Sequence, residues 1–266
     1  MKGHFCTVNN DRSFKIIRKM EIARGIHHFD CGPFNWYLIE EEGRLTLVDA
    51  GFPGHYSVYK KGLETINKTS KDIEAIVLTH AHADHIGFAE KVRKETGVKV
   101  YVHKADAKMA SKPLQLPWFG LLSNAWRAYT AKMLGVAIVN GVFTLPHVTK
   151  VQTVEDGQIL DIPGRPRIMH TPGHTDGEIS LLLEDRKVIL TGDTIVTRNL
   201  LTGEIGEPQI VNPILTNNYK QAHRTLDLLR EVGEVTMLSG HGTPWVGNMN
   251  NAVNIALESS VKKHLK

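Results

Sequence analysis

The nine residues 79–87 read Thr-His-Ala-His-Ala-Asp-His-Ile-Gly and constrain this chain more than any other stretch. They follow an apolar run, 76–78, that is typical of a buried strand. Within six residues lie three imidazoles and one carboxylate: His80, His82, His85 and Asp84. Alternate residues of an extended segment share one side, and the chain then turns into a predicted helix, so these side chains can be directed at one point.

Imidazole and carboxylate groups together are typical ligands of Zn(II), with Fe(II) and Mn(II) as alternatives. One cluster of four side chains rarely fills two coordination spheres, so further ligands are expected downstream. A solvated, inert strand end rich in histidine is the competing interpretation. Four such groups at this spacing, with matching partners later in the chain, favour metal binding instead.

The composition is that of an ordinary globular protein. The chain has 266 residues, of which 41% are hydrophobic and 23% charged, which excludes collagen, coiled coil and general disorder. Its length lies only slightly above that of a typical single domain. We therefore expect one domain that spans 1–266.

The charge pattern argues against a nucleic-acid partner. A formal charge of +4 is mildly basic, and the cationic residues are dispersed apart from pairs such as 60–61 and 262–263. No extended basic track is indicated, although a small anionic substrate is compatible with this charge. Cys6 and Cys31 lie 25 residues apart, without the spacing of a zinc ribbon or a disulfide framework.

Neither an export signal nor a membrane span is predicted. The polar residues 9–13 follow the first few residues directly, so the N-terminus has no apolar core like that of a signal peptide. The longest uncharged apolar stretch, 113–126, contains two prolines and is shorter than the roughly 20 residues that a span needs. We expect a cytoplasmic protein with a small-molecule substrate and without a nucleic-acid or membrane partner.

The first hundred residues predict a meander followed by alternating helices and strands. The meander strands, rich in β-branched and aromatic residues, are 14–18, 26–29, 34–40 and 44–49. The elements after them are a helix around 58–66, a strand at 74–78, a helix at 86–96 and a strand at 98–102. Strands that alternate with helices indicate a sheet covered by helices.

The second half repeats this pattern after an apolar insertion at about 104–150. The insertion concentrates bulky apolar residues in what we expect to be one or two helices, which would form a pocket wall, core or a homodimer contact. A second meander is expected over 151–190, a helix near 218–230 and a strand at 235–239. Two similar halves predict an α/β fold, a four-layered αβ/βα sandwich with the metal at the rim where the sheets meet.

The groups at predicted strand ends are five histidines and two aspartates: His80, His82, Asp84, His85, His174, Asp193 and His241. Their flanking motifs are His-x-His-x-Asp-His, Pro-Gly-His-Thr, Gly-Asp-Thr and Gly-His-Gly, in this order. In these motifs, which extend over nearly the whole chain, the sequence resembles the metallo-β-lactamase-fold hydrolases, including the lactonases and glyoxalase II.

The resemblance implies a dinuclear centre, with two zinc ions per chain, or iron or manganese. One metal would be held by His80, His82 and His174, the other by Asp84, His85 and His241, and Asp193 would bridge them. Two cations about 3.5 to 4 Å apart supply a bridging hydroxide as nucleophile near neutral pH. Asp84 would move the proton to the leaving group. Residues expected to orient the ligands are Asp49, Thr171, Thr175 and Thr194.

Departures from the family's branches narrow the expected reaction. Asp193 stands where zinc β-lactamases have a Cys ligand, and Val196 replaces the Tyr of quorum-signal lactonases. Only 25 residues follow His241, which leaves no room for the glutathione-binding domain of glyoxalase II. Ala83 replaces the Glu ligand of flavodiiron proteins. We expect hydrolysis of a small ester, lactone or thioester.

Three alternatives stay open at this point: a mononuclear iron persulfide dioxygenase, a phosphodiesterase-type hydrolase of the same fold, and a catalytically silent metal-binding module. The remaining nine histidines are expected to be packing, surface or orienting residues rather than ligands. They are His4, His27, His28, His55, His103, His147, His170, His223 and His264.

Overall fold

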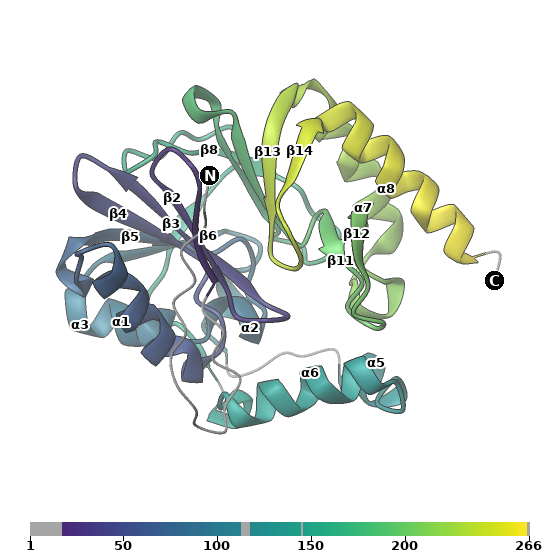
Figure 1. Ribbon diagram of the computed structural model, residues 1–266, viewed down its shortest axis with the longest axis horizontal. Coiled ribbons are helices and arrows are strands. Elements are labelled where there is room, and N and C mark those ends of the chain that lie inside the picture. The colour runs from purple at the N-terminus through teal and green to yellow at the C-terminus, as the bar shows by residue number, and fades with distance from the viewer. Residues whose placement is uncertain (1–17, 113–117, 145, 265–266) are drawn as a thin grey trace.

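The computed structural model describes residues 18–112, 118–144 and 146–264 and shows two β-sheets packed face to face with helices outside both (Figure 1). This is the αβ/βα sandwich that the sequence predicts. Apolar side chains of both sheets share one buried cluster, in which Tyr37 and Val77 of the first sheet meet Leu181 and Leu238 of the second. The fold therefore buries both sheets on both faces, which explains why their central strands are almost continuously apolar.

Seven strands of the described chain form the larger sheet, in sequence order. They are β1 (Arg18–Ala23), β2 (Ile26–Asp30), β3 (Asn35–Glu41), β4 (Arg44–Val48), β5 (Ile73–Val77), β6 (Lys99–His103) and β7 (Gln152–Val154). The first four are antiparallel neighbours, whereas β4 to β7 run parallel. Parallel neighbours need crossovers, and the helices α1 (Tyr56–Thr65) and α3 (Ala89–Thr96) lie in two of them.

Five strands of the described chain form the smaller sheet, in the order β14-β13-β10-β9-β8. They are β8 (Arg167–His170), β9 (Ile179–Leu183), β10 (Val188–Gly192), β13 (Glu234–Ser239) and β14 (Trp245–Asn248). Helices α7 (Tyr219–Thr225) and α8 (Met249–His264) cover its outer face (Figure 1). A separate hairpin joins β11 (Val196–Arg198) to β12 (Ile205–Gln209).

Helices α5 and α6, which follow β6 in the chain, lie along one edge of the sandwich, below α2 (Figure 1). Apart from α3, the α-helices between β5 and β7 are α2 (Ala83–Ile86), α4 (Ala107–Ala110), α5 (Trp118–Ser123) and α6 (Ala128–Val139). Short 3-10 helices occur at Pro53–His55, Ser70–Asp72, Val142–Thr144, Glu184–Arg186, Pro213–Leu215 and Leu226–Val232. None of the helices in the described ranges combines the length and the apolar composition that a membrane crossing needs.

The strands are arranged so that their carboxyl ends meet at one edge. β10 pairs in parallel with β13, and β8 runs in the same direction because β9 lies antiparallel between β8 and β10. The loops that follow β8, β10 and β13 therefore leave the smaller sheet at the same edge. In α/β sheets this edge is where ligands bind.

Several sequence-based boundaries were wrong. The second meander does not begin at 151, because β7 pairs in parallel with β6 in the larger sheet. The helix expected at 86–96 is interrupted after α2, and the one near 218–230 continues beyond α7 as a 3-10 helix. The strand expected at 14–18 lies outside the described residues except for Arg18, where the unpredicted β1 begins. Strands β11, β12 and β14 and helix α8 were not predicted either.

Gly87, between α2 and α3, makes a close backbone contact outside the helix. Its amide donates to the carbonyl of Gly51, 2.7 Å away, and a Cβ atom there would collide with that carbonyl oxygen and with the backbone of Phe52. Only glycine allows these two backbones to approach so closely. The contact holds α2 against the end of β4.

Replacing Gly87 with alanine should therefore destabilise the fold by about 3 kcal/mol, near the upper end for overpacking, because backbone atoms cannot move aside. Gly135→Ala is the matched control, since a Cβ atom at this helical position in α6 meets nothing within 4 Å. It should raise the stability by up to about 1 kcal/mol through helix propensity. Thermal melts followed by circular dichroism compare the two variants, and equal melting temperatures would contradict the steric argument.

Candidate metal centre

The motif at 79–87 divides between a loop and a helix. His80 lies in the loop that follows β5, His82 is the N-cap residue of α2, and Asp84 and His85 occupy the first turn of that helix. The amides of His85 and Ile86 donate to the carbonyl of His82, which closes this turn. The two levels of ligands that the sequence predicts thus come from the change of backbone conformation at His82.

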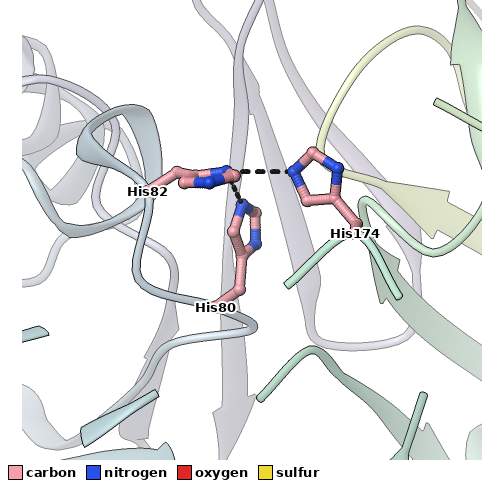
Figure 2. Close-up of side chains that lie close together, drawn as sticks. All are labelled: His80, His82 and His174. Carbon is pink, nitrogen blue, oxygen red and sulfur yellow. Dashed lines mark hydrogen bonds between the residues drawn. The ribbon is translucent and has the colours of Figure 1, made fainter. Parts of the chain in front are cut away.

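Three imidazoles converge at the first candidate site (Figure 2). Nδ1 of His82 lies 3.0 Å from Nε2 of His80 and 2.9 Å from Nε2 of His174. Nitrogen ligands about 2.0–2.1 Å from one zinc ion are roughly 3.4 Å apart in tetrahedral geometry, so small shifts would accommodate an ion. All three rings are buried, and His174 reaches the other two from the loop after β8.

The second candidate site contains Asp84, His85 and His241. Oδ2 of Asp84 lies 3.6 Å from Nε2 of His85 and 3.5 Å from Nε2 of His241. Asp193 lies between the two sites, because its Oδ2 is 3.4 Å from Nε2 of His174 and 3.1 Å from Nε2 of His241. The structure therefore brings together all seven side chains that the sequence selects.

Several of these atoms are buried without a hydrogen-bond partner. Nε2 of His85, Nε2 of His241 and Oδ1 of Asp193 make no hydrogen bond to any described residue. Buried polar groups are normally satisfied, and three unsatisfied ligand atoms that face one another fit divalent cations. The residues present therefore suit the metals that the sequence implies.

Hydrogen bonds at the far ring nitrogens orient two of the ligands. Nδ1 of His85 lies 2.8 Å from Oδ2 of Asp49, and Nδ1 of His241 donates to the carbonyl of Pro33, 2.6 Å away. Each bond places the proton on Nδ1, which leaves the Nε2 lone pair for a metal. Asp49 also accepts from the amide and the hydroxyl of Thr79, so it joins the loop to the helix as the sequence predicts.

Electrostatics divides the histidines into two classes. Burial lowers the pKa of His80 and His82, and it lowers that of His174 to about 3, so these rings are neutral and able to ligate. Burial also acts against the charged form of His85, but Asp49, Asp84 and Asp193 outweigh it and raise its pKa to about 10. A cation bound there would replace the proton, which makes metal binding dependent on pH.

Sequence reasoning missed Asp106, a buried carboxylate just after β6. It accepts hydrogen bonds from the amide of Ala81 at 3.0 Å, the hydroxyl of Thr175 at 2.9 Å and the amide of Gly177 at 2.8 Å. Asp106 thereby connects the loop of His80 and His82 with the loop of His174. Its position after a predicted strand end, like that of Asp49, was the available signal.

A second missed carboxylate is Glu178, which is fully buried. Its Oε1 accepts from the amide of Asp193 at 2.9 Å, and its Oε2 lies 3.3 Å from Nδ1 of His80. Burial raises its pKa well above the usual range. No motif marked this residue, because its contacts come from segments that are far apart in the sequence.

The other predicted orienting residues and the remaining histidines lie around this centre. Thr171 and Thr194 share a hydrogen bond of 2.7 Å between their hydroxyls. His103 and His170 stack on each other with ring centroids 3.8 Å apart, outside the ligand clusters. Including these two, seven histidines from His27 to His223 were expected not to be ligands, and none of them belongs to the clusters in the described chain; His4 lies outside the described residues.

An apolar cavity of about 190 Å³ opens beside the metal ligands. His82, Asp84, His174, Asp193 and His241 form its polar end. The rest of the lining is apolar: Phe34, Phe52, Leu122, Met133, Leu134, Ala137, Ile138, Val142, Phe143, Leu200 and Leu215. Most of these come from the predicted insertion, so α5, α6 and the 3-10 helix after them contribute a wall of the cavity.

The chain is similar to several known proteins in sequence and in fold. The model of the metallo-beta-lactamase superfamily matches residues 30–241. The probable metallo-hydrolase YflN of Bacillus subtilis is 27% identical over 85% of this chain and 87% of its own. Hydroxyacylglutathione hydrolase GloC of Haemophilus influenzae is 23% identical, over 77% and 82%. A metallo-beta-lactamase family protein from Thermus thermophilus has a TM-score of 0.64 and 21% identity, over 91% and 81%.

Asp106→Asn should weaken metal binding about 10- to 100-fold, the usual effect of losing a group that orients ligands. The side-chain NH2 group of the new asparagine would face backbone and hydroxyl donors, which in the wild type donate to a carboxylate oxygen of Asp106. Competition with a chromophoric chelator measures the change. Asp156→Asn is the control, because Asp156 accepts one backbone bond from His170 at an exposed site, which an amide oxygen can also accept. Equal affinities in both variants would refute the role of Asp106.

Proposed function

The chain belongs to the metallo-beta-lactamase superfamily, and from this premise we propose that it is a dinuclear metal-dependent hydrolase of a small ester, lactone or thioester with an apolar part. The observation that carries the proposal is the cluster of seven candidate ligand groups, six of them buried and Asp84 partly exposed, at one end of an apolar cavity. In this proposal the first metal is held by His80, His82 and His174. The second is held by Asp84, His85 and His241, with Asp193 shared between them.

Two divalent cations, with zinc as the proposed metal, would lower the pKa of a bound water toward about 7 and polarise a substrate carbonyl. The chain itself supplies the geometry for proton movement. Asp84 lines the cavity and keeps 16% of its side chain exposed, more than the other ligand carboxylate, Asp193. We assign it the role of accepting the proton of the nucleophile and delivering it to the leaving oxygen or sulfur.

The cavity supports an uncharged, apolar acyl group. Among the described residues, neither lysine nor arginine lines it, so no cation there would pair with an anionic substrate group. Burial of an acyl chain in this space would contribute about 0.8 kcal/mol for each CH2 group. An anionic carrier, such as the glutathione in the name of GloC, would have to stay outside the cavity.

Metal content separates this proposal from the persulfide dioxygenase and from a silent module. Elemental mass spectrometry of protein purified without chelator should find about two zinc ions per chain. Asp193→Ala should lower both the metal content and ester hydrolysis, because Asp193 contacts both sites. Asp185→Ala, in an exposed turn, should change neither. One iron per chain with oxygen consumption, or metal without any turnover, would contradict the hydrolase.

Acyl selectivity tests the cavity. The wild type should prefer p-nitrophenyl hexanoate to the acetate by roughly 10- to 100-fold in kcat/KM, because up to four more CH2 groups are buried. Ala137→Phe should abolish this preference, since Ala137 lines the cavity from α6. Ala131→Phe places the same ring on the exposed side of that helix and should keep the preference. A loss of preference in both variants would point away from the cavity.

A further inference from the structure

The segment that walls the cavity leaves bulky apolar side chains in water. Ten large apolar side chains of the described chain are well exposed, and five of them lie within 122–143. They are Leu122 (61% exposed), Trp126 (77%), Ile138 (52%), Val139 (77%) and Phe143 (61%). Soluble proteins seldom keep such a concentration uncovered without a partner. We call residues 118–144, which contain α5 and α6, the apolar arm.

The cavity opens onto this arm. Leu122, Ile138 and Phe143 belong both to the exposed apolar side chains and to the cavity lining. An apolar group could thus pass from the surface of the arm into the cavity along aliphatic and aromatic contacts. The arm lies along the edge of the sandwich that also carries α2 and its ligands (Figure 1).

Within the stretch of sequence that contains the arm, all charges have one sign. Between Asp106 and Glu155 the chain contains no acidic residue, and its five cations are Lys108, Lys112, Arg127, Lys132 and Lys150. The four lysines are exposed, and the guanidinium of Arg127 lies 4.6 Å from the ring centroid of Trp126. Basic residues beside exposed Trp, Phe and Leu are typical of segments that bind at the surface of an anionic bilayer.

We propose that the apolar arm is a docking surface for membranes that contain anionic lipids, and that the mouth of the cavity faces the bilayer. Lipid headgroups would complement all five cations, whereas the tips of Trp126 and Val139 would enter the interface. A second copy of this chain fits less well, because a two-fold contact would place the same cations against one another. The acidic Glu204 and Glu207 of the β11–β12 hairpin would not outweigh them.

This proposal differs from the sequence-based expectation that the protein has no membrane partner. That expectation rested on the absence of a segment long enough to span a bilayer. Docking at the interface needs only an exposed apolar face and basic charge. One consequence concerns the substrate: an acyl compound dissolved in the bilayer could enter the cavity without crossing water. That consequence rests on the proposed function, whereas docking itself does not.

Vesicle sedimentation tests the docking. The metal-loaded full chain should sediment with vesicles of phosphatidylcholine and phosphatidylglycerol, and at least tenfold less with phosphatidylcholine alone or in 0.5 M NaCl, because salt screens the cations. The double variant Trp126→Ser/Val139→Ser should lower the partition coefficient between vesicles and water about tenfold. Leu228→Ser/Val246→Ser, at positions 57% and 74% exposed outside the arm, should leave it unchanged. Thermal melts establish that both variants fold.

Neither Trp126 nor Val139 is among the residues that line the cavity, so the arm variant separates docking from catalysis. Lost sedimentation with retained hydrolysis of a water-soluble ester supports the proposal. Equal sedimentation of both double variants would overturn it, as would binding that ignores lipid charge and salt. Light scattering that shows a dimer dissociated by Trp126→Ser/Val139→Ser would also overturn it, because a second copy would then cover the arm.

Discussion

Seven imidazole and carboxylate side chains, six of them buried, crowd together at one edge between two sheets, and the rest of this structure depends on that constraint. Burying such groups is costly unless each is paired or binds a metal. Hydrogen bonds from outside the cluster meet part of this requirement, while Nε2 of His85, Nε2 of His241 and Oδ1 of Asp193 have no hydrogen-bond partner among the described residues. Asp49 and Asp106, which follow the parallel strands β4 and β6, flank the loop after β5 and hold it from both sides.

The cluster exists only because the two sheets are joined in a definite relative position. The side-chain amide of Asn35 donates to the carbonyls of Ser239 and Gly242, and the hydroxyl of Tyr37 donates to the carbonyl of Ser239. Ligands from the second sheet are thus held by residues of β3 in the first. At Gly240 a side chain would collide with Asp193 and His85, so glycine is needed for the loop of His241 to approach them.

Three environments adjoin one another along this edge: a dense polar centre, an apolar cavity and a basic apolar surface. The first concentrates ligand atoms and determines which chemistry is available. In the proposed function, the second receives the apolar part of a substrate beside the centre. In our proposal, the third places the mouth of the cavity against a lipid bilayer. The insertion at 104–150 contributes to the second and third, while most of the ligands come from loops at the edge of the sheets.

The sequence by itself determined the elements near His80, His82, Asp84 and His85, because His-x-His-x-Asp-His after an apolar strand is a local pattern with few folded outcomes. Its later motifs selected His174, Asp193 and His241, which the structure brings to the same place. It also indicated the αβ/βα layers, since period-two and helical patterns alternate along the chain. Only the tertiary structure decided that β7 joins the first sheet, that Glu178 contacts both His80 and Asp193, and that Leu122, Ile138 and Phe143 are at once cavity wall and surface. These features depend on contacts between residues that are distant in sequence, and local periodicity carries no information about which distant surfaces meet.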